Sequence, residues 1–143
     1  MKVPVHMTVI NAKARMIEDF RIAVDDGRAH SVCLDLPPDM GTDMGPTALE
    51  LGVMSFAGCV ATIFVLMVKK MRLKISQLEV AMKAEKPEGA STVTRADYTL
   101  IRKSPENKER LRRAFDLMRQ NCPVGLIFEK AGINVTFSLK LIE

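Results

Sequence analysis

Several residue types that support particular functions are scarce in this 143-residue chain. It has no tryptophan, one tyrosine and six phenylalanines, which are too few aromatic side chains for a surface on which nucleobases stack. The net charge of +4 is mild, and the basic cluster 108-KERLRR-113 has acidic residues nearby. We therefore expect this cluster to be a solvated helix face, and we expect no nucleic-acid partner.

Metal-binding and disulfide patterns are also missing. The two histidines stand alone, and the three cysteines, Cys33, Cys59 and Cys122, are separated by 26 and 63 residues without a CxxC motif. An odd number of widely spaced cysteines argues for reduced thiols and against both a structural disulfide framework and a zinc site. We expect no bound metal and no resident cofactor.

A secretory signal is not recognisable at the N-terminus. The first ten residues, MKVPVHMTVI, have a β-like pattern, without a charged segment followed by an apolar block and a cleavage site. The sequence therefore predicts a cytoplasmic protein.

The most conspicuous feature is an apolar run, residues 51–68, without a single charge. It has three possible interpretations: a membrane span, an ordinary core helix, or a buried helix that holds a reactive thiol. Eighteen residues is the lower limit for crossing a bilayer. The run also contains Gly52, Ser55, Gly58 and Thr62 and has no Trp or Tyr at its ends. We therefore expect no membrane partner.

Apolar residues alternate in the flanking segments, which is typical of β-strands. The alternation predicts strands over 3–9, 20–24, 32–36, 78–82, 96–100 and 133–141. Asp26-Gly27 predicts a hairpin turn between the second and third strands. The element order βββ-α-ββ-α(α)-β indicates an α+β fold, in one domain that covers residues 1–143.

Helix boundaries are also visible in the sequence. Thr47 and Glu50 form a capping-box pattern directly before the apolar run. The triplet Ser104-Pro105-Glu106 is typical of an N-cap, a first-turn proline and a first-turn acid. This second helix must end or restart at Pro123.

The apolar run also predicts a dimer. A chain this short cannot cover an apolar helix on every side with its own residues. One small sheet covers one side of a helix, so we expect a second copy of the chain to cover the other in a symmetric homodimer.

The cysteines leave two interpretations open. Gly52, Ser55, Cys59 and Thr62 share one stripe of small side chains at helical spacing, where Cys59 could be merely a small buried hydrophobe. Cys122 precedes Pro123 at a helix start, where the helix dipole favours a thiolate, although it could be a cap residue chosen for size. Cys33 is expected to be a bystander on a strand.

The element order and two motifs resemble the OsmC/Ohr superfamily over nearly the full length of the chain. The segment 45-GPTALELGVMSFAGC-59 is similar to the family's Pro-x-Glu-Leu helix start running to its first cysteine, and 122-CPVG-125 is similar to its second Cys-Pro motif. The resemblance implies an intertwined homodimer in which antiparallel sheets surround long central helices.

The resemblance also implies thiol-dependent reduction of hydroperoxides, with Cys59 as the peroxidatic and Cys122 as the resolving cysteine. Members with strong activity carry a glutamate ten residues before the first cysteine, where this chain has Leu49, and Glu50 follows one position later. They also place an arginine near the thiolate, for which Arg15 and Arg21 are the candidates.

The leading hypothesis is therefore a thiol peroxidase that acts in oxidative-stress defence. Its substrate would be a small apolar hydroperoxide, held in an apolar pocket beside Cys59 that includes Phe56, Ile63 and Phe64, and an external dithiol would be its reductant. An arginine in contact with the Cys59 thiol is the discriminating feature, and its absence within hydrogen-bond reach would count heavily against this activity. The alternative is a catalytically weak or inactive OsmC-like dimer that binds an apolar ligand or partner.

Overall fold

The computed structural model describes residues 7–142, and these form two compact units that divide between Leu51 and Gly52. The predicted element order and the α+β class are both confirmed. The single domain predicted over residues 1–143 stays a prediction.

The first unit contains an antiparallel sheet in the order β1-β2-β3. Its strands are β1 Lys13–Glu18, β2 Arg21–Asp25 and β3 Ser31–Leu34. The turn between β2 and β3 confirms the predicted hairpin. Gly27 has φ +76°, a conformation that suits glycine. The Gly27 N–H donates a hydrogen bond to the Asp25 carboxylate at 3.0 Å.

The predicted first strand was misplaced. Residues 3–6 of it lie outside the described residues, 7–12 contain no strand, and the first strand within the described range is β1. Apolar alternation did not indicate β1 because every residue of this strand is exposed. Its position comes from backbone pairing with β2, in which Lys13 lies opposite Asp25 and Ala14 opposite Val24.

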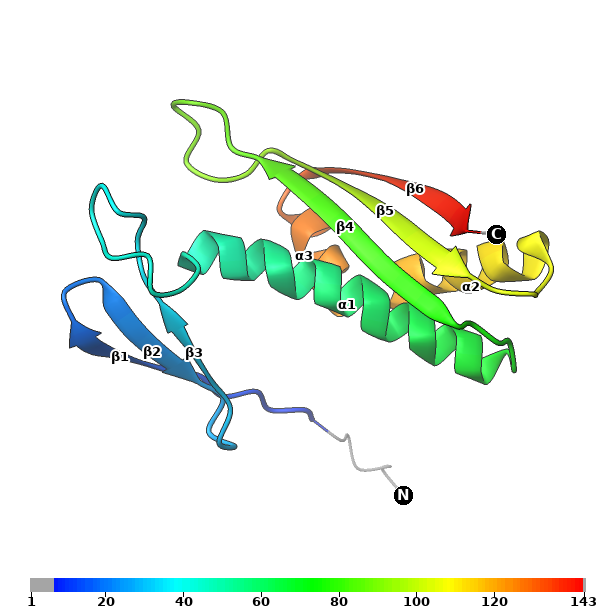
Figure 1. Cartoon of the computed structure of the whole chain (residues 1–143), viewed down its shortest axis with the longest axis horizontal. Helices are drawn as coiled ribbons and strands as arrows, with labels where there is room; N and C mark the ends of the chain where they lie inside the picture. The colour runs from blue at the N-terminus through cyan, green and yellow to red at the C-terminus, as the bar shows by residue number, and fades with distance from the viewer. Residues whose placement is uncertain (1–6, 143) are drawn as a thin grey trace, which may run out of the picture. The chain divides into compact units, whose positions relative to one another are not determined.

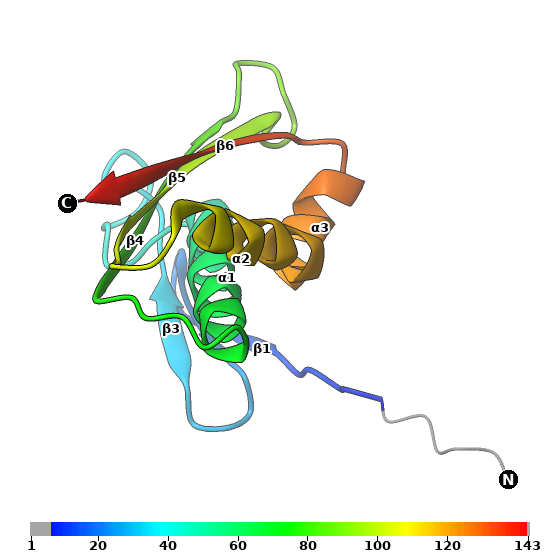
Figure 2. The same ribbon diagram turned by 90° about the vertical axis from the view of Figure 1, so that its right-hand side faces the viewer.

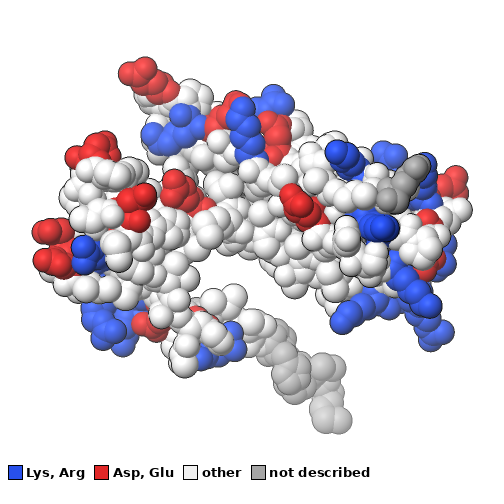
Figure 3. Space-filling view, in the orientation of Figure 1, with Lys and Arg blue, Asp and Glu red and all other residues white. Residues whose placement is uncertain are grey.

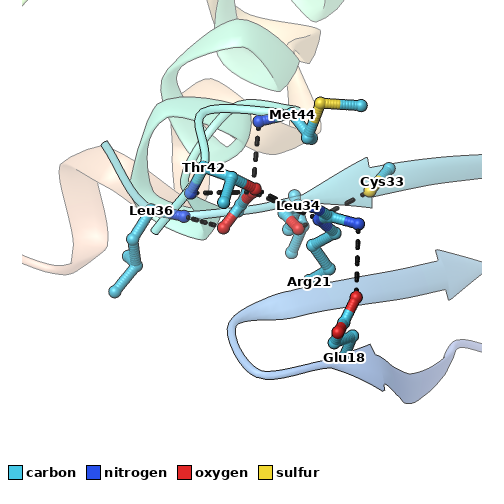
Figure 4. A network of polar contacts seen from close by, with 8 residues as sticks. Glu18, Arg21, Cys33, Leu34, Leu36, Thr42 and Met44 are labelled. Carbon is cyan, nitrogen blue, oxygen red and sulfur yellow. Dashed lines mark hydrogen bonds and ion pairs between the residues drawn. The ribbon is translucent and has the colours of Figure 1, made fainter. Parts of the chain in front are cut away.

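A buried carboxylate orders the loop that follows β3. Asp35 is 2% exposed, and its two oxygens accept hydrogen bonds from the backbone N–H groups of Leu36, Thr42 and Met44 and from the Thr42 hydroxyl (Figure 4). These bonds, led by that of Thr42, lower the pKa of Asp35 to about 2. Gly41 is required nearby, because a Cβ there would lie 2.5 Å from the carboxylate.

We expect the Asp35→Asn variant to unfold at a lower temperature than the unmodified protein at pH 7, because an amide nitrogen cannot accept these donors. The low pKa of Asp35 stabilises the fold above pH ~4, and this contribution is lost as the pH falls toward about 2. The difference between variant and parent should therefore shrink on acidification. Thermal unfolding at pH 7, 5 and 3 measures it, and an equal difference at all three values would contradict the explanation.

The second unit is a sheet covered on one face by helices (Figures 1 and 2). β4 pairs antiparallel with β5, and β6 pairs parallel with β5. The expectation of antiparallel sheets was therefore wrong for β6, because the helical crossover between β5 and β6 brings the chain back in the same direction. The elements are α1 Ala48–Lys70, which begins in the first unit, β4 Gln77–Glu85, β5 Arg95–Lys103, α2 Lys108–Asn121, α3 Pro123–Lys130 and β6 Asn134–Ile142.

The core of the second unit lies between this sheet and its helices. Phe64 of α1, Leu100 of β5 and Phe115 of α2 are all nearly inaccessible to solvent and belong to one apolar cluster. Burial alternates along β5, so that Ala96, Tyr98 and Leu100 and their neighbours at even positions face the helices.

α2 begins later than predicted. Its N-cap is Asn107, whose side chain accepts hydrogen bonds from the N–H groups of Glu109 and Arg110. Ser104, the predicted cap, is used elsewhere: its hydroxyl donates to the Lys74 carbonyl and accepts from the Glu106 N–H. The prediction was wrong because Ser104 serves this contact with the segment after α1.

A buried arginine lies on the helix-covered face of this sheet. Arg102 of β5 is 5% exposed, and its Nε and Nη1 atoms have no hydrogen-bond partner among the described residues. Burial lowers the pKa of this guanidinium. Alternation along the strand forces this position inward, since Leu100 and Arg102 share the covered face.

α1 presents two different faces. Phe56, Val60 and Phe64 pack into the core, whereas Met54 and Leu66 on the other side are 54% and 41% exposed. The helix is long and apolar enough to cross a membrane, and 28% of its most apolar 18-residue window is buried within the chain. Its open side is largely uncharged, while lysines and arginines gather where α1 ends and α2 begins (Figure 3).

Candidate functional site

The two cysteines singled out in the sequence meet in the second unit. Cys59 lies on α1, and Cys122 lies between α2 and α3, at the N-cap of α3. The Cys122 thiol donates a hydrogen bond to the Cys59 sulfur, with the two Sγ atoms 3.2 Å apart. A disulfide needs an S–S distance of about 2.05 Å, so a shift of roughly 1 Å would join them.

Cys122 is the hydrogen-bond donor of this pair. Burial, and secondly the hydrogen bond to Cys59, raise the pKa of Cys122 to about 12, although the N–H groups of Gly125 and Val124 at the start of α3 act in the opposite direction. The sequence predicted that the helix start would favour a Cys122 thiolate. That expectation was wrong, because the thiol is 2% exposed and burial outweighs the helix terminus.

Gly125 allows the close packing around Cys122. A Cβ at this position would lie 2.9 Å from the Phe56 ring and 3.2 Å from the Cys122 sulfur. The Phe56 ring in turn packs edge-on against Tyr98, with ring centroids 5.8 Å apart. A side chain at position 125 would therefore displace the ring or the thiol, a requirement that the sequence pattern did not reveal.

A small cavity adjoins Cys122. Its volume of about 10 Å³ is close to the lower limit for one water molecule. An open groove of about 540 Å³ runs along α2 and α3 beside it, lined by Asp116, Gln120 and Leu126 among others. Arg119 and Glu129 line both spaces, so they stand between the cavity and the groove.

Phe56 and Phe64, two of the three residues expected to line an apolar substrate pocket, are buried in the core, and Phe56 also lines the cavity of about 10 Å³ beside Cys122. They are 2% and 0% exposed, respectively. The third, Ile63, is partly exposed and packs against the same core. The expectation was wrong for Phe64, because the inward face of α1 is filled by its own sheet and helices. The cavity that Phe56 lines has room for about one water molecule and not for a hydroperoxide.

Glu50 confirms its predicted capping role. Its carboxylate accepts a hydrogen bond from the Thr47 N–H at 2.9 Å, and the Thr47 hydroxyl accepts from the Glu50 N–H at 3.1 Å. This reciprocal pair satisfies two N–H groups at the start of α1.

The two candidate arginines belong to the first unit. Arg15 lies on the exposed strand β1. Arg21 donates to the Thr42 hydroxyl at 3.1 Å and lies within ion-pair distance of Glu18 and Asp35 (Figure 4). A hollow of about 240 Å³ beside Arg21 is lined by described residues without a cysteine among them. Within the described part of the second unit, no arginine donates a hydrogen bond to Cys59.

The remaining cysteine takes no part in this arrangement. Cys33 lies on β3 of the first unit, is partly exposed, and its thiol donates weakly to the Leu34 carbonyl at 3.7 Å. Among the described residues, histidine, cysteine, aspartate and glutamate side chains form no cluster that could hold a metal ion.

Comparisons with known proteins agree on one family. The family profile "OsmC-like protein" matches residues 41–138, whereas a search of curated proteins gave no significant match. A structural-genomics structure is 25% identical, with a TM-score of 0.82 over 92% of this chain and 98% of the other. An OsmC-like protein from Mycoplasma pneumoniae is 15% identical, with a TM-score of 0.84 over 95% and 99%.

An organic hydroperoxide resistance protein from Elizabethkingia anophelis, with thiocyanate bound, is also similar. It is 15% identical and has a TM-score of 0.75 over 97% of this chain and all of the other. Likeness at this level of identity establishes the fold, while the sequence profile covers both cysteine motifs. The chain therefore belongs to the OsmC-like protein family, within the OsmC/Ohr superfamily.

Proposed function

We propose that this protein is a thiol peroxidase that reduces organic hydroperoxides, with Cys59 as the peroxidatic and Cys122 as the resolving cysteine. The observation that carries the proposal is the 3.2 Å separation of their sulfur atoms across 63 positions of sequence. Such proximity is what a two-cysteine cycle needs, because the oxidised first sulfur must be reached by the second.

The roles follow from the surroundings of the two sulfurs. Cys122 is buried and donates a hydrogen bond to Cys59. Cys59 accepts this hydrogen bond and is partly exposed. An S–H donor stabilises a thiolate, which is the attacking species. Cys59 is thus the better placed nucleophile, and Cys122 the better placed partner for the second step.

The cycle balances with two substrates. The Cys59 thiolate attacks a peroxide oxygen, the O–O bond breaks, and the departing alkoxide takes a proton to become an alcohol. The resulting sulfenic acid condenses with the Cys122 thiol to form a disulfide and water. An external dithiol then restores both thiols by disulfide exchange, so no resident cofactor is required.

Family membership supports a role in peroxide stress. The relatives include proteins named for organic hydroperoxide resistance, from Elizabethkingia anophelis and Legionella pneumophila. We place the protein in the cytoplasm, where dithiol donors keep such cysteines reduced. Leu49 stands where strongly active members carry glutamate. The Cys59–Cys122 contact therefore supports peroxidase activity more strongly than family membership does.

The test is one round of oxidation. The reduced protein is treated with one equivalent of cumene hydroperoxide, free thiols are blocked, and peptides are analysed by mass spectrometry. We expect a Cys59–Cys122 disulfide, a free Cys33, and loss of the peroxide in proportion. When dithiothreitol is added as the reductant, we expect the protein to consume further equivalents of peroxide.

An unoxidised pair together with unconsumed peroxide would contradict the proposal. The protein would then fit the alternative function, an OsmC-like dimer that binds an apolar ligand. The same experiment with hydrogen peroxide tests substrate preference, since we expect the organic peroxide to react faster.

A further inference from the structure

We propose that Arg119 is the residue that makes Cys122 reactive in the second half of the cycle, by stabilising the negative charge that this thiol must acquire. The inference rests on the proposed peroxidase function and adds a positioning residue to it. Arg119 lies in the last turn of α2, three residues before Cys122.

Cys122 needs such help because its surroundings oppose ionisation. To attack the sulfenic acid on Cys59, it must lose its proton, yet burial and the hydrogen bond to Cys59 raise its pKa to about 12. A buried thiolate requires a nearby cation or hydrogen-bond donors. The N–H groups of Val124 and Gly125 supply part of this stabilisation.

Arg119 is the cation placed to supply the rest. It lines the cavity of about 10 Å³ that Cys122 also lines. Its guanidinium carbon lies 3.8 Å from the centroid of the Phe137 ring, a cation–π contact that fixes the side chain. Among the described residues, no carboxylate lies within ion-pair distance of Arg119, so its charge is not neutralised by a direct partner.

Titratable groups approach this cavity from α1, β5, α2 and α3, whereas β6 contributes an apolar side chain to its lining. Cys59 approaches Cys122 from α1, Tyr98 lies on β5, Arg119 on α2 and Glu129 on α3. Burial raises the pKa of Tyr98 to about 12, with smaller influences from Arg119, Cys122 and Glu129, which agrees with the four groups lying together. Tyr98 therefore remains a neutral phenol, and Arg119 is the cation of the set.

The chemistry of the step uses the cavity as well. The Cys122 proton leaves, its sulfur attacks the Cys59 sulfur, the S–S bond forms, and the S–O bond of the sulfenic acid breaks. The departing hydroxide combines with the proton to give one water molecule. Arg119 and Glu129 line both the cavity and the open groove, so we expect the proton and the water to leave on that side.

The experiment separates the two steps in Arg119→Met. Reduced protein is mixed with cumene hydroperoxide and quenched at intervals, and mass spectrometry follows the Cys59 sulfenic acid, trapped by dimedone, and the Cys59–Cys122 disulfide. In the variant we expect disulfide formation to be slower than in the parent on the order of 10-fold, while sulfenic acid formation keeps its rate. A 10-fold effect corresponds to losing thiolate stabilisation of about one pKa unit at Cys122.

Two further variants distinguish charge from structure. Arg119→Lys should restore most of the disulfide-forming rate, because it retains a cation. Arg113→Met removes an exposed arginine from the same helix, outside both spaces, and should leave both rates unchanged. The disulfide-forming rate of Arg119→Met should also reach half its maximum at a higher pH than that of the parent.

Failure of this inference is distinguishable from failure of the proposed function. If sulfenic acid forms and Arg119→Met makes the disulfide as fast as the parent, or if Lys does not rescue a slow Met variant, the role of Arg119 is refuted. If the parent forms neither sulfenic acid nor disulfide, the peroxidase proposal itself falls.

Discussion

The Cys59→Ser variant is expected to consume cumene hydroperoxide at least about 1,000-fold more slowly than the parent, in an assay with excess dithiothreitol. A serine hydroxyl is not ionised near neutral pH and is a far weaker nucleophile toward peroxide oxygen than a thiolate. The change removes one sulfur from a partly exposed position, so the fold should survive, as circular dichroism can verify.

Two other cysteine variants serve as controls. Cys33→Ser should retain the parent's rate, since Cys33 lies on β3, in a different unit from the thiol pair. Cys122→Ser should still react in the first step but accumulate a Cys59 sulfenic acid that dimedone traps. Unchanged turnover in Cys59→Ser would assign the peroxide chemistry to another residue and contradict the proposed mechanism.

The second large effect concerns self-association. We expect the unmodified protein to form a homodimer of about twice 15.9 kDa, in which the open face of α1 is covered by a second copy. That face includes exposed Met54 and Leu66, and the small residues Ser55, Gly58 and Thr62 lie between them. Apart from the adjoining residues of its own helix, no described atom lies within 4 Å of a Cβ built at Gly58, so a partner's surface can approach closely.

The Leu66→Lys variant should disrupt this dimer. A lysine in an apolar interface of more than about 2,000 Å² in total would bury an unpaired charge. Light scattering after size-exclusion chromatography should show loss of the dimer, and thermal unfolding should shift downward because association stabilises the fold. The matched control is Gln77→Lys, which adds the same charge at an exposed position of β4.

Phe64, on the same helix, is a less suitable test site than Leu66. It is 0% exposed within its own chain, so Phe64→Lys would damage the core whether or not a dimer forms. A parent protein that is a well-folded monomer at micromolar concentration would refute the dimer.

Sequence patterns were sufficient where the determining interactions are local. The Thr47–Glu50 capping pair, the Gly27 turn and the start of α3 at Pro123 each depend on residues within a few positions of one another. The two cysteine motifs were also visible, because their types and spacing matched a known family pattern.

Features that depend on distant contacts were not predictable in this way. The direction of the Cys122 pKa depends on burial by surrounding elements, which outweighs the helix start that the sequence showed. The buried Asp35 looked like an ordinary polar strand residue, and its role depends on the loop that folds back over it. In the sequence, Arg119 cannot be told apart from the other arginines of a basic helix. Its position at the cavity beside Cys122 depends on how α2, α3 and the sheet pack together.

The separation of the two cysteines along the chain has a thermodynamic consequence. A Cys59–Cys122 disulfide would close a loop across 63 positions, which contains β4, β5 and α2. Restricting the unfolded chain in this way stabilises a protein by about 4 kcal/mol in the chain-entropy description. The oxidised form would therefore resist heat and protease better than the reduced form. Folding and oxidation are thermodynamically linked, so the folded chain favours the disulfide over the dithiol more than the unfolded chain does. Reducing this disulfide in the folded protein therefore suits a dithiol donor, whose own oxidation closes a ring.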